Sequence, residues 1–287
     1  MSATPISQVI TPALRQWIVE QAAAGHAHEA VLKSMRASGW EEDVAIAALE
    51  ETLHDFVGRH AREHGLLEPV LVPQPVPEEG VAVLRAGDRE VQVVAKLELP
   101  RIIVLAGLLS ADECDELVEL ARVRLARSET VELATGASEV NASRTSEGMF
   151  FGRGENELCS RFEARIAALC NWPVENGEGL QILRYQPGAE YKPHYDYFDP
   201  QQPGTPAILK RGGQRVATIV TYLNTPQRGG ATIFPDVKFD VAPIKGNAVF
   251  FSYDRPHPMT RSLHGGAPVL EGEKWVATKW LRQGRFD

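Results

Sequence analysis

Two stretches of this chain carry side chains whose types and spacing suit the binding of one metal ion. His194 and Asp196 are two residues apart in a segment with the composition of a β-strand, and His264 lies far downstream. Side chains at positions i and i+2 of a strand project to the same face, so the imidazole and the carboxylate can bind one ion from one side. With His264 as a third donor, the set covers one face of an octahedral ion and leaves the opposite positions open to small ligands.

Two histidines and one carboxylate on one face form the ligand set of non-haem Fe(II) oxygenases. A His-x-Asp tripeptide alone is weak evidence, because most such tripeptides lie on protein surfaces by chance. Here the pair lies in a strand-like segment, a later predicted strand ends at His264, and Lys274 begins the next one. The combination favours a metal centre formed by His194, Asp196 and His264.

Lys274 is the second residue with a chemical interpretation. The residues that follow it, 275–277, are apolar, and a buried ammonium is costly without a counter-charge. A dicarboxylate cosubstrate can provide that counter-charge, and the hydroxyls of Tyr185 and Thr232 can complete the clamp. Lysines at the start of a strand are usually solvated, so an exposed Lys274 is the alternative.

The composition is that of an ordinary soluble globular protein. The chain has 287 residues, of which 44% are hydrophobic and 24% charged, and its formal net charge is -8. This charge does not fit the basic footprint of a nucleic-acid-binding protein. No apolar run reaches the length that crosses a bilayer. We therefore expect neither a nucleic-acid nor a membrane partner.

The cysteines indicate a reducing compartment. Cys114, Cys159 and Cys170 are odd in number and widely spaced, which argues against a disulfide framework. We expect them to be buried thiols in helices. The first ten residues lack the basic and apolar pattern of a secretory signal, so we expect a cytoplasmic protein.

The hydrophobic pattern divides the chain into three parts. Residues 1–64 contain three predicted helices that resemble a small bundle of the ubiquitin-associated type. Residues 65–90 are proline-rich and predict a semi-rigid linker, and residues 91–287 carry all the motifs above. We expect residues 11–62 to bind a protein partner, to self-associate, or only to pack structurally.

The third part is predicted to be an α+β domain. A capping box at Ser110–Glu113 opens its first helix. Many short strands separated by Gly and Pro clusters predict a sandwich or jelly roll, with the helices packed on one outer face. The predicted elements include helices at about 110–127 and 155–170 and strands at 91–97, 101–105, 180–185, 191–196, 215–224, 232–234, 248–252, 260–264 and 274–282.

Several motifs of the third part occur in the order found in one enzyme family. The motifs are Leu183–Gly188, Tyr191–Phe198, Gly213–Thr218, Tyr222–Asn224, Gly229–Pro235, Ser262–His264 and Gly272–Trp280. They resemble the prolyl 4-hydroxylase branch of the iron- and 2-oxoglutarate-dependent dioxygenases. The resemblance covers about residues 98–283 and does not extend to the first 90 residues.

The resemblance implies a double-stranded β-helix (jelly roll) core with flanking helices. The implied Fe(II) ligands are His194, Asp196 and His264, and the implied 2-oxoglutarate-binding residues are Lys274, Tyr185 and Thr232. In this family dioxygen is the second cosubstrate, and ascorbate is the expected reductant.

The resemblance also implies a peptide groove, which maps onto Tyr191, Arg215 and Trp280. The loops Glu132–Arg144 and Phe198–Gly213 look like mobile flaps that close over the substrate. Arg282 departs from the family pattern, because some collagen-type members carry at this position a histidine that helps to hold the substrate. The departure concerns the identity of the substrate and not the iron chemistry.

The leading interpretation is a dioxygenase that hydroxylates prolyl residues in a peptide or protein and decarboxylates 2-oxoglutarate to succinate. One alternative is the hydroxylation of a free amino acid or another small molecule on the same scaffold. A different alternative is a binding protein in which the N-terminal helices recruit partners.

Overall fold

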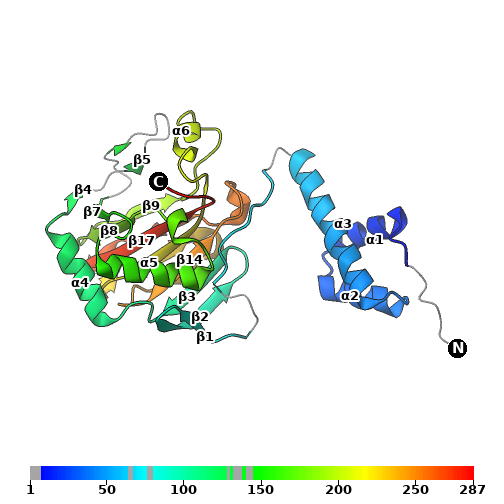
Figure 1. The fold of residues 1–287 in the computed structure, drawn as a ribbon, viewed down its shortest axis with the longest axis horizontal. Helices are drawn as coiled ribbons and strands as arrows, with labels where there is room; N and C mark the ends of the chain where they lie inside the picture. The colour runs from blue at the N-terminus through cyan, green and yellow to red at the C-terminus, as the bar shows by residue number, and fades with distance from the viewer. Residues whose placement is uncertain (1–7, 64–66, 76–79, 128–129, 132–137, 140–144) are drawn as a thin grey trace. The chain divides into compact units, whose positions relative to one another are not determined.

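A computed structural model of the chain describes residues 8–63, 67–75, 80–127, 130–131, 138–139 and 145–287. The chain divides into two compact units, Met1–Glu68 and Pro69–Asp287 (Figure 1). Each unit has an apolar core of its own. In the described residues, no helix has the length and apolar character that crossing a membrane requires.

Three helices form the N-terminal unit: α1 (Pro12–Ala23), α2 (His28–Ala37) and α3 (Glu42–Glu63). The side chain of Thr11 accepts a hydrogen bond from the backbone N–H of Leu14, and Pro12 occupies the first turn of α1. Both features favour the start of a helix. The helices pack around the buried residues Ile18, Val31, Met35, Ala45, Ala48 and Leu49.

The second unit holds the remaining elements. Its helices are α4 (Ala111–Arg122), α5 (Glu157–Cys170) and α6 (Thr205–Leu209), with short 3-10 helices at Val174–Asn176, Pro235–Val237 and Pro258–Thr260. Its strands are β1 (Val83–Ala86), β2 (Arg89–Leu97), β3 (Arg101–Ala106), β4 (Ala126–Arg127), β5 (Thr130–Val131), β6 (Ser138–Glu139), β7 (Glu147–Phe151), β8 (Leu180–Tyr185), β9 (Tyr191–His194), β10 (Arg215–Tyr222), β11 (Arg228–Gly229), β12 (Thr232–Phe234), β13 (Phe239–Val241), β14 (Ala248–Ser252), β15 (His264–Gly266), β16 (Val269–Glu271) and β17 (Lys274–Arg282).

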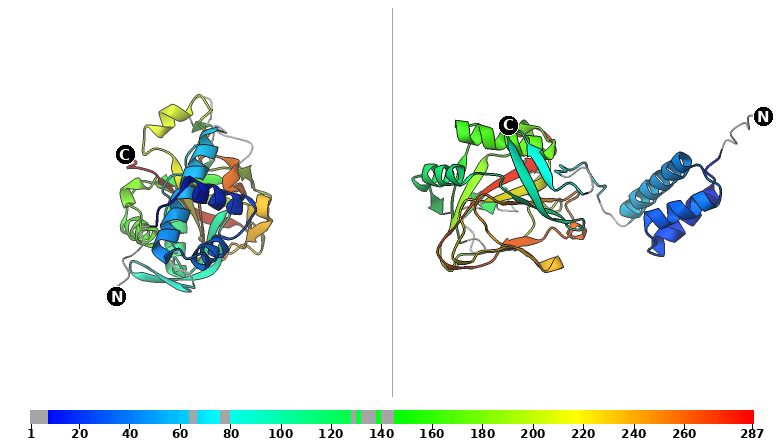
Figure 2. Two further views of the ribbon diagram at one scale, coloured as in Figure 1. Left: turned by 90° about the vertical axis from the view of Figure 1, so that its right-hand side faces the viewer. Right: turned by 90° about the horizontal axis from the view of Figure 1, so that it is seen from below.

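Two antiparallel sheets form the frame of the second unit. The larger has nine strands in the order β1-β2-β3-β14-β10-β17-β8-β7-β4, and the smaller has four in the order β13-β12-β15-β9. From β8 onward the chain passes back and forth between them: β8, β10, β14 and β17 belong to the larger sheet, and β9, β12, β13 and β15 to the smaller. Figure 2 shows the sheets from two further directions. Strands distant in sequence therefore become neighbours.

The larger sheet buries both of its faces. One face packs against the smaller sheet through Leu183, Tyr222, Phe234, Phe251 and Val276. The other face is covered by α4 and α5 (Figure 1), whose Leu117, Phe162 and Ile166 pack with Ile103, Ile219 and Trp275. Helices on one outer face of an antiparallel sheet are what the α+β prediction required.

The start of α4 follows the sequence prediction, but its end does not. The Ser110 hydroxyl accepts from the N–H of Glu113, and the Glu113 carboxylate accepts from the N–H of Ser110, which confirms the capping box. The helix ends at Arg122 and not near Arg127. Because residues 123–127 include no glycine or proline, the sequence does not mark the end, and it is the pairing of Ala126 with Gly148 that makes this segment a strand.

Two predicted strand boundaries near the metal-binding residues are wrong. His264 begins β15 instead of ending a strand, because residues 258–260 form a 3-10 turn that Arg261 closes in the left-handed region (φ 51°). β9 ends at His194, so Asp196 follows the strand instead of lying in it. The i and i+2 argument therefore does not describe how the carboxylate is placed.

The predicted linker, residues 65–90, is partly structured. β1 and the first residues of β2 lie within it, and Leu84 and Ala86 of β1 are buried. Upstream of the strands, the backbone N–H of Val70 donates to the carbonyl of Asp254, and Val72 is buried. The prolines of this segment predict a linker, whereas the alternation of exposed and buried side chains along β1 places that strand in the sheet.

Candidate metal centre

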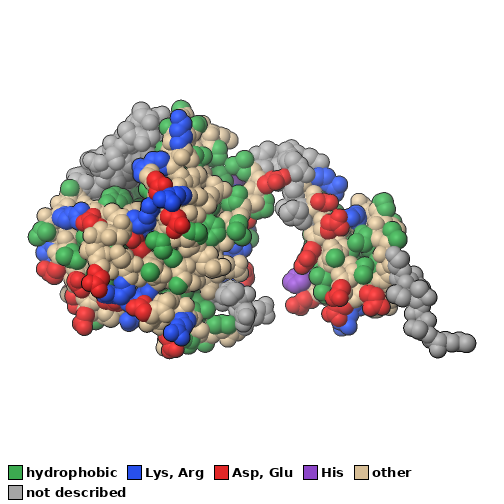
Figure 3. Space-filling view, viewed as in Figure 1, with side chains coloured by type: hydrophobic (Ala, Val, Ile, Leu, Met, Phe, Trp, Pro, Cys, Tyr) green, Lys and Arg blue, Asp and Glu red, His purple; other side chains and the backbone are tan. Residues whose placement is uncertain are grey.

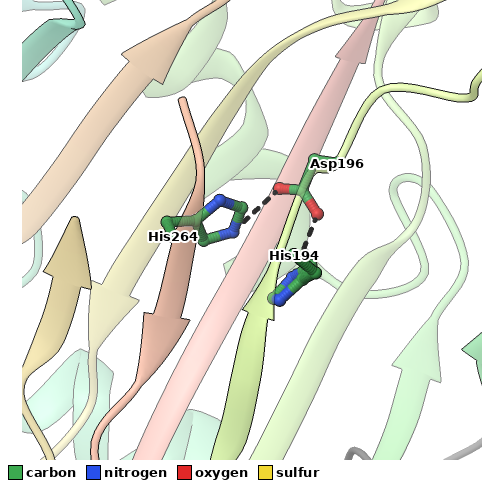
Figure 4. Close-up of side chains that lie close together, drawn as sticks. All are labelled: His194, Asp196 and His264. Atoms are coloured by element: carbon green, nitrogen blue, oxygen red, sulfur yellow. Dashed lines mark ion pairs between the residues drawn. The ribbon is translucent and has the colours of Figure 1, made fainter. Parts of the chain in front are cut away.

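The three predicted metal ligands meet at one point of the second unit. His194 and His264 lie opposite each other in the antiparallel β9–β15 pair, and Asp196 follows β9 directly. Each residue offers one ligand atom, and these atoms lie within 4.8 Å of one another. Figure 4 shows one carboxylate oxygen of Asp196 directed toward each imidazole, with Oδ1 3.6 Å from Nε2 of His194 and Oδ2 3.5 Å from Nε2 of His264.

A glycine allows the two histidine-bearing strands to approach. A Cβ atom on Gly265 would lie 2.8 Å from the carbonyl oxygen of Tyr191 and 3.1 Å from the nitrogen of Pro193. Because real Cβ atoms do not approach backbone so closely, any larger residue would push β15 away from β9. The lack of a side chain at Gly265 therefore allows the strands that carry His194 and His264 to lie this close together.

Each imidazole is oriented by a carbonyl of its own chain. Nδ1 of His194 lies 2.8 Å from the carbonyl oxygen of Lys192, and Nδ1 of His264 lies 3.0 Å from that of Ser262. A proton on Nδ1 satisfies these carbonyls and leaves the lone pair of Nε2 directed at the centre. Burial lowers the pKa of His264 to about 4, so its imidazole is neutral, as a metal ligand must be.

Asp196 is a buried carboxylate held in its ionised form. Burial opposes ionisation, but His264, His194 and Arg215 outweigh it and hold the pKa of Asp196 well below its usual range. The hydroxyl of Thr218 donates to Oδ2 at 2.6 Å. The centre therefore combines an anionic oxygen donor with the imidazole nitrogens of two histidines.

Lys274 lies in the interior of the same unit, so the exposed alternative is wrong. It is 4% exposed, and it pairs with Tyr185 across β17 and β8. Its Nζ lies 5.4 Å from the ring centroid of Tyr185 and 5.8 Å from that of Tyr222. Burial lowers its pKa to about 7. Within the described part of the chain no carboxylate pairs with it.

Thr232 and Gly230 complete the surroundings of this lysine. The hydroxyl of Tyr222 donates to Oγ1 of Thr232 at 2.8 Å. A Cβ atom on Gly230 would lie 3.2 Å from Cδ of Lys274, so this glycine makes room for the methylene chain. A buried ammonium beside hydroxyl groups suits an anionic ligand.

One cavity contains most of the predicted site residues. Its lining includes His194, Asp196 and His264 together with Tyr185, Tyr191, Thr232, Lys274 and Trp280. The ring of Tyr191 is stacked on that of His194, with centroids 3.7 Å apart. Metal ligands, buried cation and aromatic groups therefore face a common space.

Arg215 is the predicted site residue that does not line this cavity. Its Nε and Nη2 donate to the two carboxylate oxygens of Glu178 at 2.6 and 2.9 Å, and its guanidinium lies 4.0 Å from the ring centroid of Trp280. Arg282 donates through Nε to the same Glu178 at 2.6 Å. Two donors of Arg215 are therefore committed to Glu178, and its Nη1 donates to the backbone carbonyl of Asp196 at 3.4 Å.

Of the two predicted flaps, the structure describes one in full and only a short part of the other. Of the loop Glu132–Arg144, only residues 138–139 belong to the described residues, so this prediction lies outside them. The loop Phe198–Gly213 contains α6, and Gln214 joins its ends: the amide oxygen accepts from the N–H of Phe198, and the amide nitrogen donates to the carbonyl of Phe198.

Sequence reasoning missed several residues that contact the site. Thr218, Tyr222 and Tyr253 make hydrogen bonds around the metal ligands and the lysine, and Glu178 binds Arg215. Thr218 and Tyr222 had a signal, since they occupy alternate positions of a strand whose other residues are mostly apolar. Nothing in the sequence marked Glu178 or Tyr253, because their partners are distant along the chain.

Comparison with known proteins gives a family match over the site. The sequence model of the 2OG-Fe(II) oxygenase superfamily matches residues 180–282, which include all three predicted metal ligands and Lys274.

Curated relatives cover a longer part of the chain. Prolyl 4-hydroxylase 1 of Arabidopsis thaliana is 42% identical over 224 residues, which cover 72% of this chain and 76% of the relative. Prolyl 4-hydroxylase 2 of the same plant is 39% identical over 66% of this chain and 69% of the relative. Probable prolyl 4-hydroxylase 7 is 38% identical, and the match spans 64% of its length.

Solved structures include a viral collagen prolyl hydroxylase from Paramecium Bursaria Chlorella virus-1, in complex with 2OG. It is 30% identical, covers 63% of this chain and 95% of that chain, and has a TM-score of 0.49.

Proposed function

Because the chain belongs to the 2OG-Fe(II) oxygenase superfamily, in its prolyl 4-hydroxylase branch, we propose that it hydroxylates prolyl residues in a peptide or protein. In the balanced reaction, a substrate C–H group, 2-oxoglutarate and dioxygen give the C–OH group, succinate and carbon dioxide. The passage of consecutive strands between two antiparallel sheets supports a double-stranded β-helix (jelly roll) as the core.

His194, Asp196 and His264 are proposed to bind Fe(II). The donors fit this ion, since two imidazole nitrogens and one ionised carboxylate converge within 4.8 Å. A bound Fe(II) supplies the dioxygen chemistry that couples decarboxylation of 2-oxoglutarate to hydroxylation. The chain itself fixes the ligands at one cavity, where Asp196 and His264 are buried.

Lys274 is proposed to bind the far carboxylate of 2-oxoglutarate. The supporting observation is a buried cation for which the described residues provide no acid. Because Tyr222 donates to Thr232, the Thr232 hydroxyl keeps its own hydrogen for a ligand oxygen. Tyr185 presents a second hydroxyl at the same cavity. The two ends of the cosubstrate would then be held by Lys274 and by the metal centre.

Tyr191, Trp280 and Arg215 are proposed to contact the peptide. Tyr191 and Trp280 line the cavity next to the ligands. The indole Nε1 of Trp280 is buried and has no hydrogen-bond partner in the described chain, so it can donate to a carbonyl of the substrate. Arg215 supports this wall by lying against Trp280.

Three further assignments stay predictions. Ascorbate is the expected reductant, the cytoplasm is the expected location, and residues 11–62 are expected to recruit a partner or to self-associate. The unpaired state of Cys114, Cys159 and Cys170 supports a reducing compartment.

The convergence of His194, Asp196 and His264 beside the unpaired Lys274 carries the proposal. Its test is an assay of the full chain with Fe(II), 2-oxoglutarate, ascorbate and a proline-rich peptide, read as a mass gain of one oxygen and as succinate formed. We expect turnover of the peptide but not of free proline. H194A and D196A should abolish substrate-dependent succinate formation.

The matched control is T221V, which alters a buried hydroxyl on the helix-facing side of β10 and should retain activity. Full activity in H194A or D196A would contradict the ligand assignment. Turnover of free amino acids in place of peptides would support the small-molecule alternative.

A further inference from the structure

The carboxylate of Asp196 has one oxygen engaged by the protein. Oγ1 of Thr218 lies 2.6 Å from Oδ2 of Asp196, and Thr218 is completely buried on β10. A carboxylate can only accept, and a hydroxyl has a single hydrogen to donate. The hydrogen of Thr218 therefore points at Oδ2, the oxygen that also faces His264, while Oδ1 faces His194 (Figure 4).

The hydroxyl of Tyr253 contacts the hydroxyl of Thr218 and orients it. The phenol oxygen of Tyr253 lies 2.9 Å from Oγ1 of Thr218. Because the hydrogen of Thr218 is already used, Tyr253 must be the donor in this contact. Burial holds the pKa of Tyr253 well above its usual range, so the phenol keeps its hydrogen. The result is a directed chain of two hydrogen bonds that ends on the carboxylate.

Tyr253 cannot move freely away from this position. It is 2% exposed, and its backbone N–H donates to the carbonyl of Val216 at 3.0 Å. Its ring centroid lies 6.1 Å from that of Tyr197 and 6.3 Å from that of Phe251. Phe251 in turn lies 4.4 Å from the ring of His264. Tyr253 thus packs on Phe251, which lies beside one ligand, and is hydrogen-bonded toward another through Thr218.

We propose that Thr218 and Tyr253 are positioning residues that engage Oδ2 of Asp196 and fix the orientation of its carboxylate at the metal centre. Hydrogen bonds from outside the ligand set orient ligands in this way. The inference rests on the metal centre proposed above and adds two residues that act through Asp196.

The test measures binding of Co(II) alone to the full chain, with no substrate, by calorimetry and by the visible absorption of the bound ion. T218V keeps the shape of threonine but lacks the hydroxyl, and we expect it to bind Co(II) about 10-fold more weakly with an altered absorption spectrum. T218S retains the hydroxyl and should bind as the wild type does. Y253F should change affinity and spectrum in the same direction as T218V, but less.

T221V is the matched control for these variants. Thr221 lies on the same strand and is completely buried, and its hydroxyl has no hydrogen-bond partner among the residues that are described. Its replacement should leave Co(II) binding unchanged. A T221V effect equal to that of T218V would overturn the inference, because it would show a general response to changes in β10.

Two other results would overturn it. One is a T218V protein with the affinity and spectrum of the wild type, and the other is a T218S protein as impaired as T218V. Failure of the wild type to bind Co(II) would overturn the metal centre itself and this inference with it. Failure of this inference and failure of the metal centre are therefore distinguishable, because failure of the metal centre is seen in the wild type and failure of the inference only in the variants.

Discussion

At the scale of single residues, Lys274 differs from the other buried cations in having no acidic partner. Arg215 pairs with Glu178, and Lys279 pairs with Glu163. Such pairing is the usual condition for burying a charge. Lys274 has no ion pair anywhere in the described residues, and burial lowers its pKa to about 7. A buried ammonium without a counter-charge is expected of a residue that binds the carboxylate of a ligand.

The charge of Lys274 predicts how the affinity for 2-oxoglutarate depends on pH. Below pH 7 the lysine is protonated and can pair with the dianion; above pH 7 it is neutral in the free protein, and binding must first recover a proton. The dissociation constant should therefore be flat below pH 7 and rise above it. K274M should raise the constant about 10- to 100-fold at pH 6 and remove the dependence.

Calorimetry with the Co(II)-loaded protein between pH 6 and 9 measures this prediction. T221V serves as the control for a buried substitution elsewhere in the sheet and should keep the wild-type profile. A K274M protein with an unaltered dissociation constant would show that Lys274 does not bind the cosubstrate.

At the scale of elements, the ligand geometry depends on how closely β15 approaches β9. Gly265 follows His264 and faces the backbone of Tyr191. A Cβ atom added to Gly265 would lie 2.8 Å from the carbonyl oxygen of Tyr191. The neighbouring Gly266 is different, since its Cβ atom would meet nothing closer than 3.7 Å. Two adjacent glycines of one strand thus differ in how much the contact between strands depends on them.

G265A should separate β15 from β9 and weaken metal binding. Overpacking of this kind costs about 1–3 kcal/mol, so the melting temperature should also fall. G266A is the matched control and should retain Co(II) binding. The prediction fails if both variants bind Co(II) equally well.

The second prediction at this scale concerns the contact of α5 with β17. Glu163 and Lys279 form an ion pair with side chains 1% and 2% exposed, and the N–H of Gly154 also donates to Glu163 at 2.8 Å. E163Q leaves the buried ammonium without its counter-charge and should lower the free energy of unfolding by about 3–5 kcal/mol.

Urea unfolding of E163Q, K279M and the double variant E163L/K279M tests this interaction. The double variant removes both charges and should recover much of the lost stability. Equal stability of E163Q and the wild type would show that the pair contributes little.

At the scale of the whole molecule, the site belongs entirely to the unit Pro69–Asp287. Among the described residues, all that line the cavity with the predicted ligands belong to this unit. On the face that Figure 3 shows, the smaller unit Met1–Glu68 carries several acidic side chains, and its exposed acids include Glu29, Glu42 and Asp43. The role of residues 11–62 stays the prediction that they recruit a partner or self-associate.

A protein that comprises residues 69–287 should bind Co(II) and 2-oxoglutarate and turn over a short peptide as the full chain does. Capture of a protein partner, measured by pull-down, should be lost. Removal of residues 69–80 as well should destabilise the remainder, because the backbone of Val70 hydrogen-bonds to Asp254 and Val72 is buried. Loss of peptide turnover in 69–287 would assign the N-terminal unit a part in the reaction.

Local patterns in the sequence were sufficient for the longer elements of the domain, though not for β1, β7 or β13, and for the residue types of the site. The capping box of α4, the proline at the start of α1 and the two-residue alternation of the strands are read within a few positions. The same holds for the set of His194, Asp196, His264 and Lys274, whose chemistry limits the possible ligands before any fold is known. Local patterns did not predict the ends of elements that no glycine or proline marks, such as the end of α4 at Arg122.

The tertiary structure decided everything that depends on pairs distant in sequence. The sequence predicted that His194 and Asp196 share a strand, but β9 ends at His194, and the pairing with β15 brings His264 opposite it. Whether Arg215 is free or committed to Glu178, and whether Lys274 has a counter-charge, depends on which strands become neighbours. A sequence specifies which groups a protein contains, whereas burial and partners, which set their pKa values and orientation, arise only when the chain packs.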